Sequence, residues 1–198
     1  MINYGENMNL KRYLKKINKY IFVPFFIAVI SWASYFYLYG NFHKVDNDVY
    51  RSAQLFSFNM PYYLEKHNIK SILNMRNLET SQGKDWYENE KEISRNMNIA
   101  HIDYPIFNRE EASMTQMNEI VRIIKNAPKP LLIHCKAGAD RTSLASALYR
   151  YAIRTDKNAE EELSILYGHF PWLGSKTGAM DRSFKKYQSA TNLSLLQF

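Results

Sequence analysis

The chain is poor in cysteine, and its single thiol belongs to Cys135. One cysteine excludes an intramolecular disulfide and also a metal site built from several cysteines. We expect no metal and no cofactor. No internal repeat or low-complexity segment is visible, and the 46% of apolar residues can form the core of one domain with a terminal extension.

The excess of positive charge is small over most of the chain. Residues 1–40 carry a net charge of +4 out of a total of +7, which leaves +3 for the other 158 residues. Nucleic-acid binding needs a concentrated basic stripe, so we expect no nucleic-acid partner. The mild excess suits a phosphorylated substrate.

Charged residues are absent from Tyr20 to Tyr39. A helix of this length spans roughly 30 Å, about the thickness of the hydrocarbon core of a bilayer. The basic cluster that precedes it should stay cytoplasmic (Lys11, Arg12, Lys15, Lys16 and Lys19). We therefore expect a cytoplasmic N-terminus over residues 1–19, a transmembrane signal anchor over 20–39, and a domain over 40–198 outside the cytoplasm. If the host is a Gram-negative bacterium, that compartment is the periplasm.

Two other interpretations of this apolar segment stay open. The small residues Ser31 and Ala33 suit the cleavage site of a signal peptide, although the apolar stretch continues through Tyr39. A buried core helix is the other interpretation, but such helices are usually shorter and less uniformly apolar.

Strand and helix patterns alternate through the rest of the chain. Residues 41–47 are polar and predict a linker. The patterns predict strands over 49–53, 69–75, 99–106 and 131–133. They predict helices over 59–67, 85–97 (polar and exposed), from Ser113 or Thr115 to the Ala127-Pro128 break, over 142–154, from Asn158, and over 179–190. This alternation indicates an α/β sandwich with a mostly parallel central sheet flanked by helices.

A possible phosphate site follows the most apolar of these strands. Cys135 comes directly after it, Arg141 follows six residues later, and Gly138 lets the loop between them curl tightly. Backbone N–H groups of such a loop bind phosphate oxygens; here they would come from Lys136, Ala137, Gly138, Ala139, Asp140 and Arg141.

The chemistry of this loop favours covalent catalysis. The positive field of the loop lowers the pKa of the Cys135 thiol, and Arg141 can grip two phosphate oxygens at once. Attack by sulfur would give a phosphocysteine, which water hydrolyses. The alternative is a buried structural cysteine, which would not need the arginine.

The run His134-Cys135, five residues, Arg141-Thr142 resembles the signature loop of the protein-tyrosine phosphatase superfamily. The resemblance is closest to bacterial dual-specificity-like phosphatases and extends over about residues 45–190, including 49–54, 167–170 and 178–182. It implies a cysteine-phosphatase fold, Cys135 as the nucleophile, Arg141 as the phosphate clamp, and Thr142 as an aid to the leaving thiolate. His134 would orient the loop or simply be a buried, hydrogen-bonded histidine.

The general acid has several candidates, because the loop 105–112 lacks the aspartate that these enzymes usually place there. Asp140 is the favoured candidate, since an Asp-Arg pair in the signature loop resembles that of myotubularin-like and some bacterial phosphatases. Asp103, at the end of the preceding strand, and Glu110 or Glu111 are the other candidates.

Two cations are candidates for further substrate contacts. Lys136 follows the nucleophile and could contact an acidic or inositol-like substrate, or could be solvated at the rim of the pocket. Arg76 follows a buried strand and should face the same edge of the sheet as the signature loop.

The sequence thus predicts a membrane-anchored phosphatase of phosphotyrosine and also of phosphoserine or phosphothreonine. A phospholipid or another phosphorylated headgroup is an alternative substrate. The absent loop aspartate keeps open a phospho-ligand-binding pseudophosphatase. Rhodanese-like sulfur transfer and arsenate reduction are disfavoured, the first by the Arg-Thr ending, the second by the lack of a resolving cysteine.

Overall fold

The computed structural model describes residues 16–77 and 84–195. The chain divides into two compact units, residues 1–39 and 40–198. Lys11, Arg12 and Lys15 of the basic cluster lie outside the described residues.

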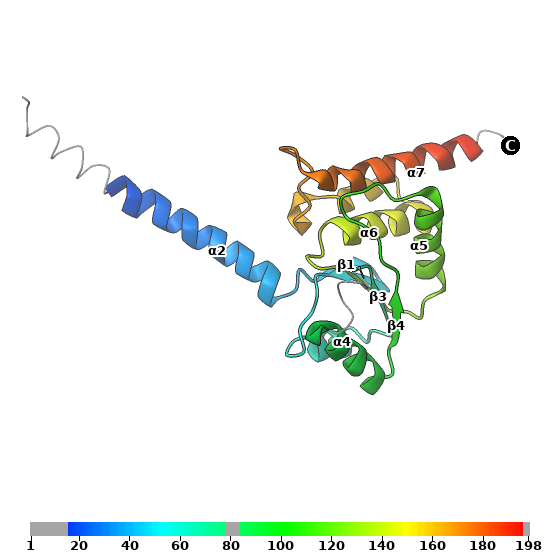
Figure 1. The fold of residues 1–198 in the computed structure, drawn as a ribbon, viewed down its shortest axis with the longest axis horizontal. Helices are drawn as coiled ribbons and strands as arrows, with labels where there is room; N and C mark the ends of the chain where they lie inside the picture. Colours follow the sequence, from blue (N-terminus) through cyan, green and yellow to red (C-terminus); the bar gives the residue numbers. More distant parts are fainter. Residues whose placement is uncertain (1–15, 78–83, 196–198) are drawn as a thin grey trace, which may run out of the picture. The chain divides into compact units, whose positions relative to one another are not determined.

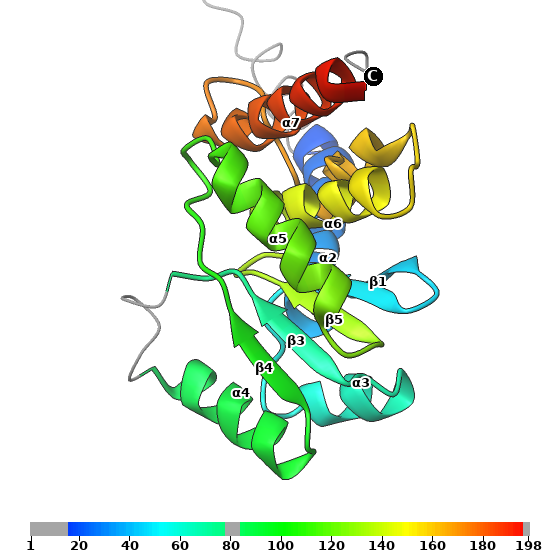
Figure 2. The ribbon, with the colours of Figure 1, turned by 90° about the vertical axis from the view of Figure 1, so that its right-hand side faces the viewer.

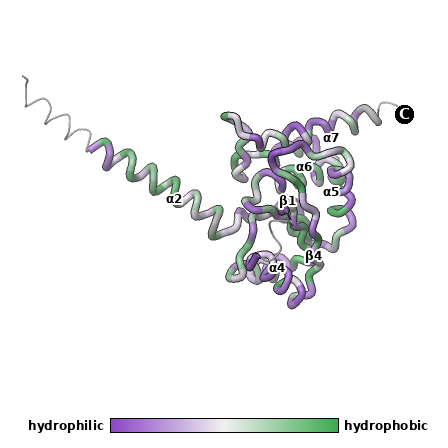
Figure 3. Tube along the Cα trace, in the orientation of Figure 1, coloured by the Kyte–Doolittle hydropathy of each residue, from purple (hydrophilic) through white to green (hydrophobic). Residues whose placement is uncertain are grey.

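The first unit is helical where it is described. A π-helical turn, η1 (Asn18–Phe22), continues into α2 (Val23–Leu38). The segment Asn18–Phe36 is long and apolar enough to cross a membrane, with a mean hydropathy of 1.4 over its most apolar window. Figure 3 shows the apolar residues that follow one another along α2. Signal sequences and the core helices of soluble proteins share this property.

The second unit is built on a five-stranded sheet of order β1-β2-β5-β3-β4. The strands are β1 (His43–Asp46), β2 (Val49–Ser52), β3 (Ser71–Asn74), β4 (Ala100–Asp103) and β5 (Leu131–His134). β5 lies in the centre and pairs in parallel with β2 and β3, while only β1 runs antiparallel, along β2. The mostly parallel α/β sheet that the sequence predicts is confirmed.

Helices cover both faces of this sheet (Figures 1 and 2). One face carries α5 (Met114–Asn126), α6 (Asp140–Ala152) and α7 (Ala179–Leu195); the other carries α3 (Met60–Lys66) and α4 (Asp85–Asn96). Three short 3₁₀ turns connect α6 to α7: η2 (Ala159–Glu162), η3 (Ile165–Tyr167) and η4 (Lys176–Gly178).

Alternating side chains of the central strand build the two cores. Leu131 and Ile133 point into the cluster shared with α5, α6 and α7, whereas Leu132 packs with Ile72 and Leu64 on the side of α3 and α4. Each of these side chains is at most 1% exposed, and burying one contributes roughly 1.5–3 kcal/mol. The core therefore fixes β5, and with it the start of the signature loop.

Three expectations about the elements differ from the structure. The expected linker over 41–47 contains β1, because an edge strand needs backbone pairing but few apolar side chains. The helix expected from Asn158 is only the 3₁₀ turn η2, and Asn158 provides no side-chain cap. The helix α4 is not wholly exposed, since it buries Tyr87, Glu90 and Ser94 on one face.

Candidate active site

The signature loop joins the buried end of β5 to the start of α6. Gly138 has a φ of +68°, and a Cβ atom there would lie 2.5 Å from the backbone nitrogen of Ala53. A side chain would therefore collide with backbone and would also strain the turn. The loop curls tightly enough to place Cys135 and Arg141 at its two ends.

The Cys135 thiol is buried, with 2% of the residue exposed. Burial alone would raise its pKa, but the Arg141 charge and hydrogen bonds from Thr142 and the Ala137 backbone lower the pKa below the ordinary value. The Thr142 hydroxyl has no other hydrogen-bond partner among the described residues. A low thiol pKa suits a nucleophile that reacts as thiolate.

The guanidinium of Arg141 is held by carbonyl oxygens and not by a carboxylate. Its Nη1 donates to the backbone oxygen of Met75 at 3.1 Å and to that of Ile106 at 3.5 Å. Its Nε is buried and has no partner among the residues that the structure describes. A buried, unpaired donor is costly, so this atom is poised for an anionic ligand.

Arg51 supports the loop from behind. This residue is fully buried, and its Nη2 donates to the Gly138 carbonyl at 2.9 Å and to the Ser143 hydroxyl at 2.7 Å. Its Nη1 lies 2.5 Å from the Glu162 carboxylate, and its guanidinium stacks on the ring of Tyr167 at 3.8 Å. The ion pair compensates the burial of the charge and anchors the loop to η2 and η3.

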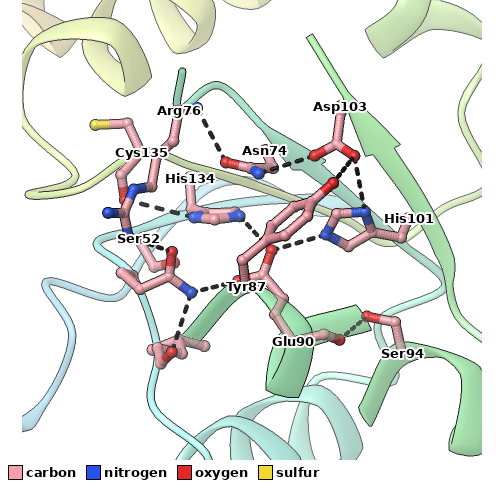
Figure 4. Close-up of polar contacts among 12 residues, drawn as sticks. Ser52, Asn74, Arg76, Tyr87, Glu90, Ser94, His101, Asp103, His134 and Cys135 are labelled. Atoms are coloured by element: carbon pink, nitrogen blue, oxygen red, sulfur yellow. Dashed lines mark hydrogen bonds and ion pairs between the residues drawn. The ribbon is translucent and has the colours of Figure 1, made fainter. Parts of the chain in front are cut away.

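His134 connects the nucleophile to a buried polar network (Figure 4). Its Nε2 lies 3.0 Å from Oε1 of Glu90, which is also 2.8 Å from Nε2 of His101. Gln54 donates to the other oxygen of Glu90. In Figure 4 the sulfur of Cys135 points away from this network. His134 is thus both buried and hydrogen-bonded.

Asp103 belongs to the same network rather than to the phosphate loop. Its carboxylate accepts hydrogen bonds from Tyr87 at 2.7 Å and Asn74 at 2.8 Å, and lies 3.6 Å from His101. Burial raises the pKa of Asp103, but the hydrogen bonds from His101 and Tyr87 have the larger effect, so the pKa lies below the ordinary value. Its oxygens are therefore engaged within this network.

Asp140 begins α6 and meets two other side chains of the second unit. His169 Nδ1 lies 2.8 Å from its Oδ1, and Asn108 Nδ2 lies 3.4 Å from its Oδ2. Of the two loop glutamates, Glu111 is exposed and bonded to Arg182 at 2.6 Å, while Glu110 is exposed at the surface. Asp140 is therefore the carboxylate that the structure brings beside the pocket.

A pocket of about 260 Å³ opens in front of the loop. Its lining comes from three loops at the same edge of the sheet: Arg76 and Asn77, Ile106 to Asn108, and Lys136 with Arg141. Arg76 stacks on Trp86 at 3.3 Å and donates to Gln54 at 2.9 Å. Burial and the nearby Arg141 charge lower the pKa of Arg76 to about 10, so it stays charged at neutral pH.

Several site residues were not predicted from the sequence. Glu90 could have been found, since it shares helical spacing with Tyr87 and Ser94 on the buried face of α4. The contact between His169 and Asp140 could not have been found from the sequence, because 29 residues separate them and only the fold brings them together.

Comparisons with known proteins find a matching family model and similar solved structures. Residues 40–188 match the family model described as a DSP-PTPase phosphatase fused to NAD+ kinase. No curated protein matches the chain.

Solved structures of phosphatases share the fold. TpbA of P. aeruginosa has a TM-score of 0.59 at 18% identity, over 74% of this chain and 84% of that chain. The core catalytic domain of the PP-IP phosphatase SIW14 from S. cerevisiae gives 0.56 at 19% identity, over 77% and 93%. PTPMT1 gives 0.53 at 14%, over 76% and 98%. Because the family model matches residues 40–188, the chain belongs to the DSP-PTPase family of the protein-tyrosine phosphatase superfamily.

Proposed function

We propose that the protein hydrolyses phosphomonoesters, namely phosphotyrosine and also phosphoserine or phosphothreonine, through a phosphocysteine intermediate. The observation that carries the proposal is the Cys135 thiol, which is buried and has a lowered pKa. It lies at the other end of the signature loop from the Nε of Arg141, which has no hydrogen-bond partner within residues 16–77 and 84–195. A structural cysteine would need neither feature.

In the first step, the sulfur of Cys135 attacks phosphorus in line with the leaving oxygen. The S–P bond forms and the P–O bond of the ester breaks, while Arg141 and the loop N–H groups hold the phosphate oxygens. The leaving oxygen takes a proton from a general acid. In the second step water attacks phosphorus, phosphate leaves, and the thiolate is restored with the help of the Thr142 hydroxyl.

Asp140 is the proposed acid, because its Oδ2 lies beside the pocket residue Asn108. It would donate a proton to the leaving group and then accept one from the attacking water. Asp103 is less suitable, since its carboxylate contacts Tyr87, Asn74 and His101, and none of these three lines the pocket. Glu111 is also less suitable, because it is exposed and forms an ion pair with Arg182.

A phospholipid or another phosphorylated headgroup is the second candidate substrate. Among the residues that the structure describes, three cations and no acidic residue line the pocket; the cations are Arg76, Lys136 and Arg141. Such a lining suits a substrate with a second anionic group. Among the similar structures, one is PTPMT1 in complex with PI(5)P and another is a PP-IP phosphatase.

The proposed location is at a membrane, with residues 20–39 as a single-pass anchor and the catalytic domain outside the cytoplasm. The apolar helix from Asn18 to Phe36 supports this. Fractionation with a carbonate wash tests it: the full-length chain should stay in the membrane pellet. A shortened soluble product would indicate cleavage of a signal peptide instead.

Hydrolysis of an aryl phosphate by the full chain tests the activity. The wild type should release phosphate, and Cys135→Ser should abolish the release while the protein stays folded. A wild type that binds the phosphate ester without hydrolysing it would instead identify a phospho-ligand-binding pseudophosphatase. The substrate class follows from comparing a phosphotyrosine peptide with a phosphoinositide in mixed micelles, for the wild type and for Arg76→Gln.

A further inference from the structure

His169 is buried between carboxylates of two helices. Its Nδ1 lies 2.8 Å from Oδ1 of Asp140 on α6, and its Nε2 lies 2.9 Å from Oδ2 of Asp181 on α7. The side chain of His169 is 0% exposed, and those of Asp140 and Asp181 are 18% and 28% exposed. Its backbone N–H also donates to the carbonyl of Ser164 at 3.1 Å, which fixes the chain at this point.

The hydrogen bonds of this cluster require an extra proton. A neutral imidazole carries one N–H, so it can donate to only one of two carboxylates. The charged groups that face the ring are Asp140 and Asp181. Burial lowers the pKa of His169, but hydrogen bonds to Asp140 and Asp181 more than offset it and raise the pKa above the ordinary value. A ring that carries both protons is a cation and can donate in both directions.

This arrangement constrains the Asp140 carboxyl group. The bond from His169 engages Oδ1, so the group cannot rotate freely. The other oxygen, Oδ2, then lies next to Asn108, which lines the pocket. Oδ2 is thus the oxygen on the pocket side, and its contact with Asn108, at 3.4 Å, is longer than the 2.8 Å contact between His169 and Oδ1.

We propose that His169 and Asp181 form a positioning pair that turns Oδ2 of Asp140 toward the leaving oxygen of the substrate. The inference rests on the proposed function, in which Asp140 is the general acid. In the first step the proton on Oδ2 passes to the leaving oxygen as the P–O bond breaks, and in the second step water returns a proton to Oδ2. His169 keeps both of its protons throughout and touches no reacting atom.

Two substrates separate positioning of the acid from general structural damage. Phenyl phosphate has a poor leaving group that needs a proton, whereas 2,4-dinitrophenyl phosphate does not. Asp140→Asn in the full chain should lower kcat/KM for phenyl phosphate by about 10²–10⁴-fold. It should change kcat/KM for the dinitrophenyl ester by less than about threefold, because no proton transfer is lost there.

Two substitutions of His169 form a matched pair. His169→Asn keeps an N–H donor near the position of Nδ1, which faces Asp140, whereas His169→Gln places its donor near Nε2, which faces Asp181. We expect His169→Gln to lower kcat/KM for phenyl phosphate by about 10–100-fold, with little effect on the dinitrophenyl ester. His169→Asn should recover most of this loss. In the Asp140→Asn background, neither substitution should lower the rate further.

The pH profile gives a second readout. Both substitutions remove a positively charged ring next to the proposed acid, so the alkaline limb of kcat/KM should move to higher pH. If the His169 variants fail to fold, kcat/KM of Asp181→Asn is compared on phenyl phosphate and 2,4-dinitrophenyl phosphate instead.

Three outcomes would contradict the inference. Equal losses of kcat/KM on phenyl phosphate and the dinitrophenyl ester in His169→Gln, or in Asp181→Asn if it replaces that variant, would show that His169 and Asp181 have only a structural role. An alkaline limb that does not move would do the same. Equal losses in Asp140→Asn itself would overturn the proposed acid together with this inference, whereas a selective Asp140→Asn with an unselective His169→Gln would overturn the inference alone.

Discussion

The Nε2 atom of His134 lies 3.0 Å from the carboxylate of Glu90, and each side chain is only 2% exposed. The residue before the nucleophile is therefore held by a buried charge on α4, a helix from the other face of the sheet. Because His101 and Gln54 bind the same carboxylate, Glu90 ties together β5, β4 and the segment after β2.

Replacing Glu90 should destabilise the protein strongly. Glu90→Gln removes the buried carboxylate that binds His134 and His101, and breaking a buried pair of this kind typically costs about 3–5 kcal/mol. Urea unfolding at pH 7 should show a loss of this order. The matched control is Glu119→Gln, which breaks an exposed pair with Arg122 and should not change the unfolding midpoint measurably.

The stability of the domain should depend on pH through His101. Although burial lowers its pKa, hydrogen bonds and charges of Asp103 and Glu90 raise it to about 9. The stabilisation is therefore fully present below about pH 6.5, the unfolded pKa, and is lost as the pH rises through 9. The loss should be on the order of 3 kcal/mol.

Urea unfolding at several pH values checks this dependence. His101→Gln should remove the decline between pH 6.5 and 9, whereas a substitution of the partly exposed His67 should leave it in place. An identical pH dependence in wild type and His101→Gln would contradict the assignment.

The buried Arg51 should be essential for the shape of the phosphate loop. Arg51→Lys cannot donate at once to Gly138, Ser143 and Glu162, because an ammonium lacks the planar fork of a guanidinium. We expect a loss of about 2–4 kcal/mol in stability and at least a tenfold drop in kcat/KM. The control Arg154→Lys changes an exposed ion pair with Asp46 and should leave kcat/KM unchanged.

Two glycines with positive φ allow backbone strain to be separated from collision. Gly138 (+68°) would place a Cβ atom 2.5 Å from backbone, whereas Gly174 (+76°) has nothing within 4 Å of that position. Both alanine variants carry about 1 kcal/mol of conformational strain. Only Gly138→Ala should distort the loop and lower kcat/KM, by about 100-fold. Equal kinetics in the two variants would show that the loop tolerates a side chain.

The parallel sheet and the position of the signature loop could be predicted from the sequence, because an apolar strand, a glycine turn and a helix follow one another there. The edge strand β1 could not, because its polar side chains carry no such periodicity. The buried network around Glu90 and the cluster of His169 with Asp181 also escaped prediction. Polar groups that pair across the fold look like surface residues until their partners are known.

Trapping of a phosphoenzyme tests the central claim most directly. The full chain is mixed with ³²P-labelled aryl phosphate, quenched within milliseconds, and digested for mass spectrometry. We expect phosphate attached to the sulfur of Cys135, a burst close to one equivalent of the leaving group when the second step is slow, and no label in Cys135→Ser. Turnover by the wild type with no label on Cys135 would contradict the proposed mechanism. Undiminished activity of Cys135→Ser would contradict it as well.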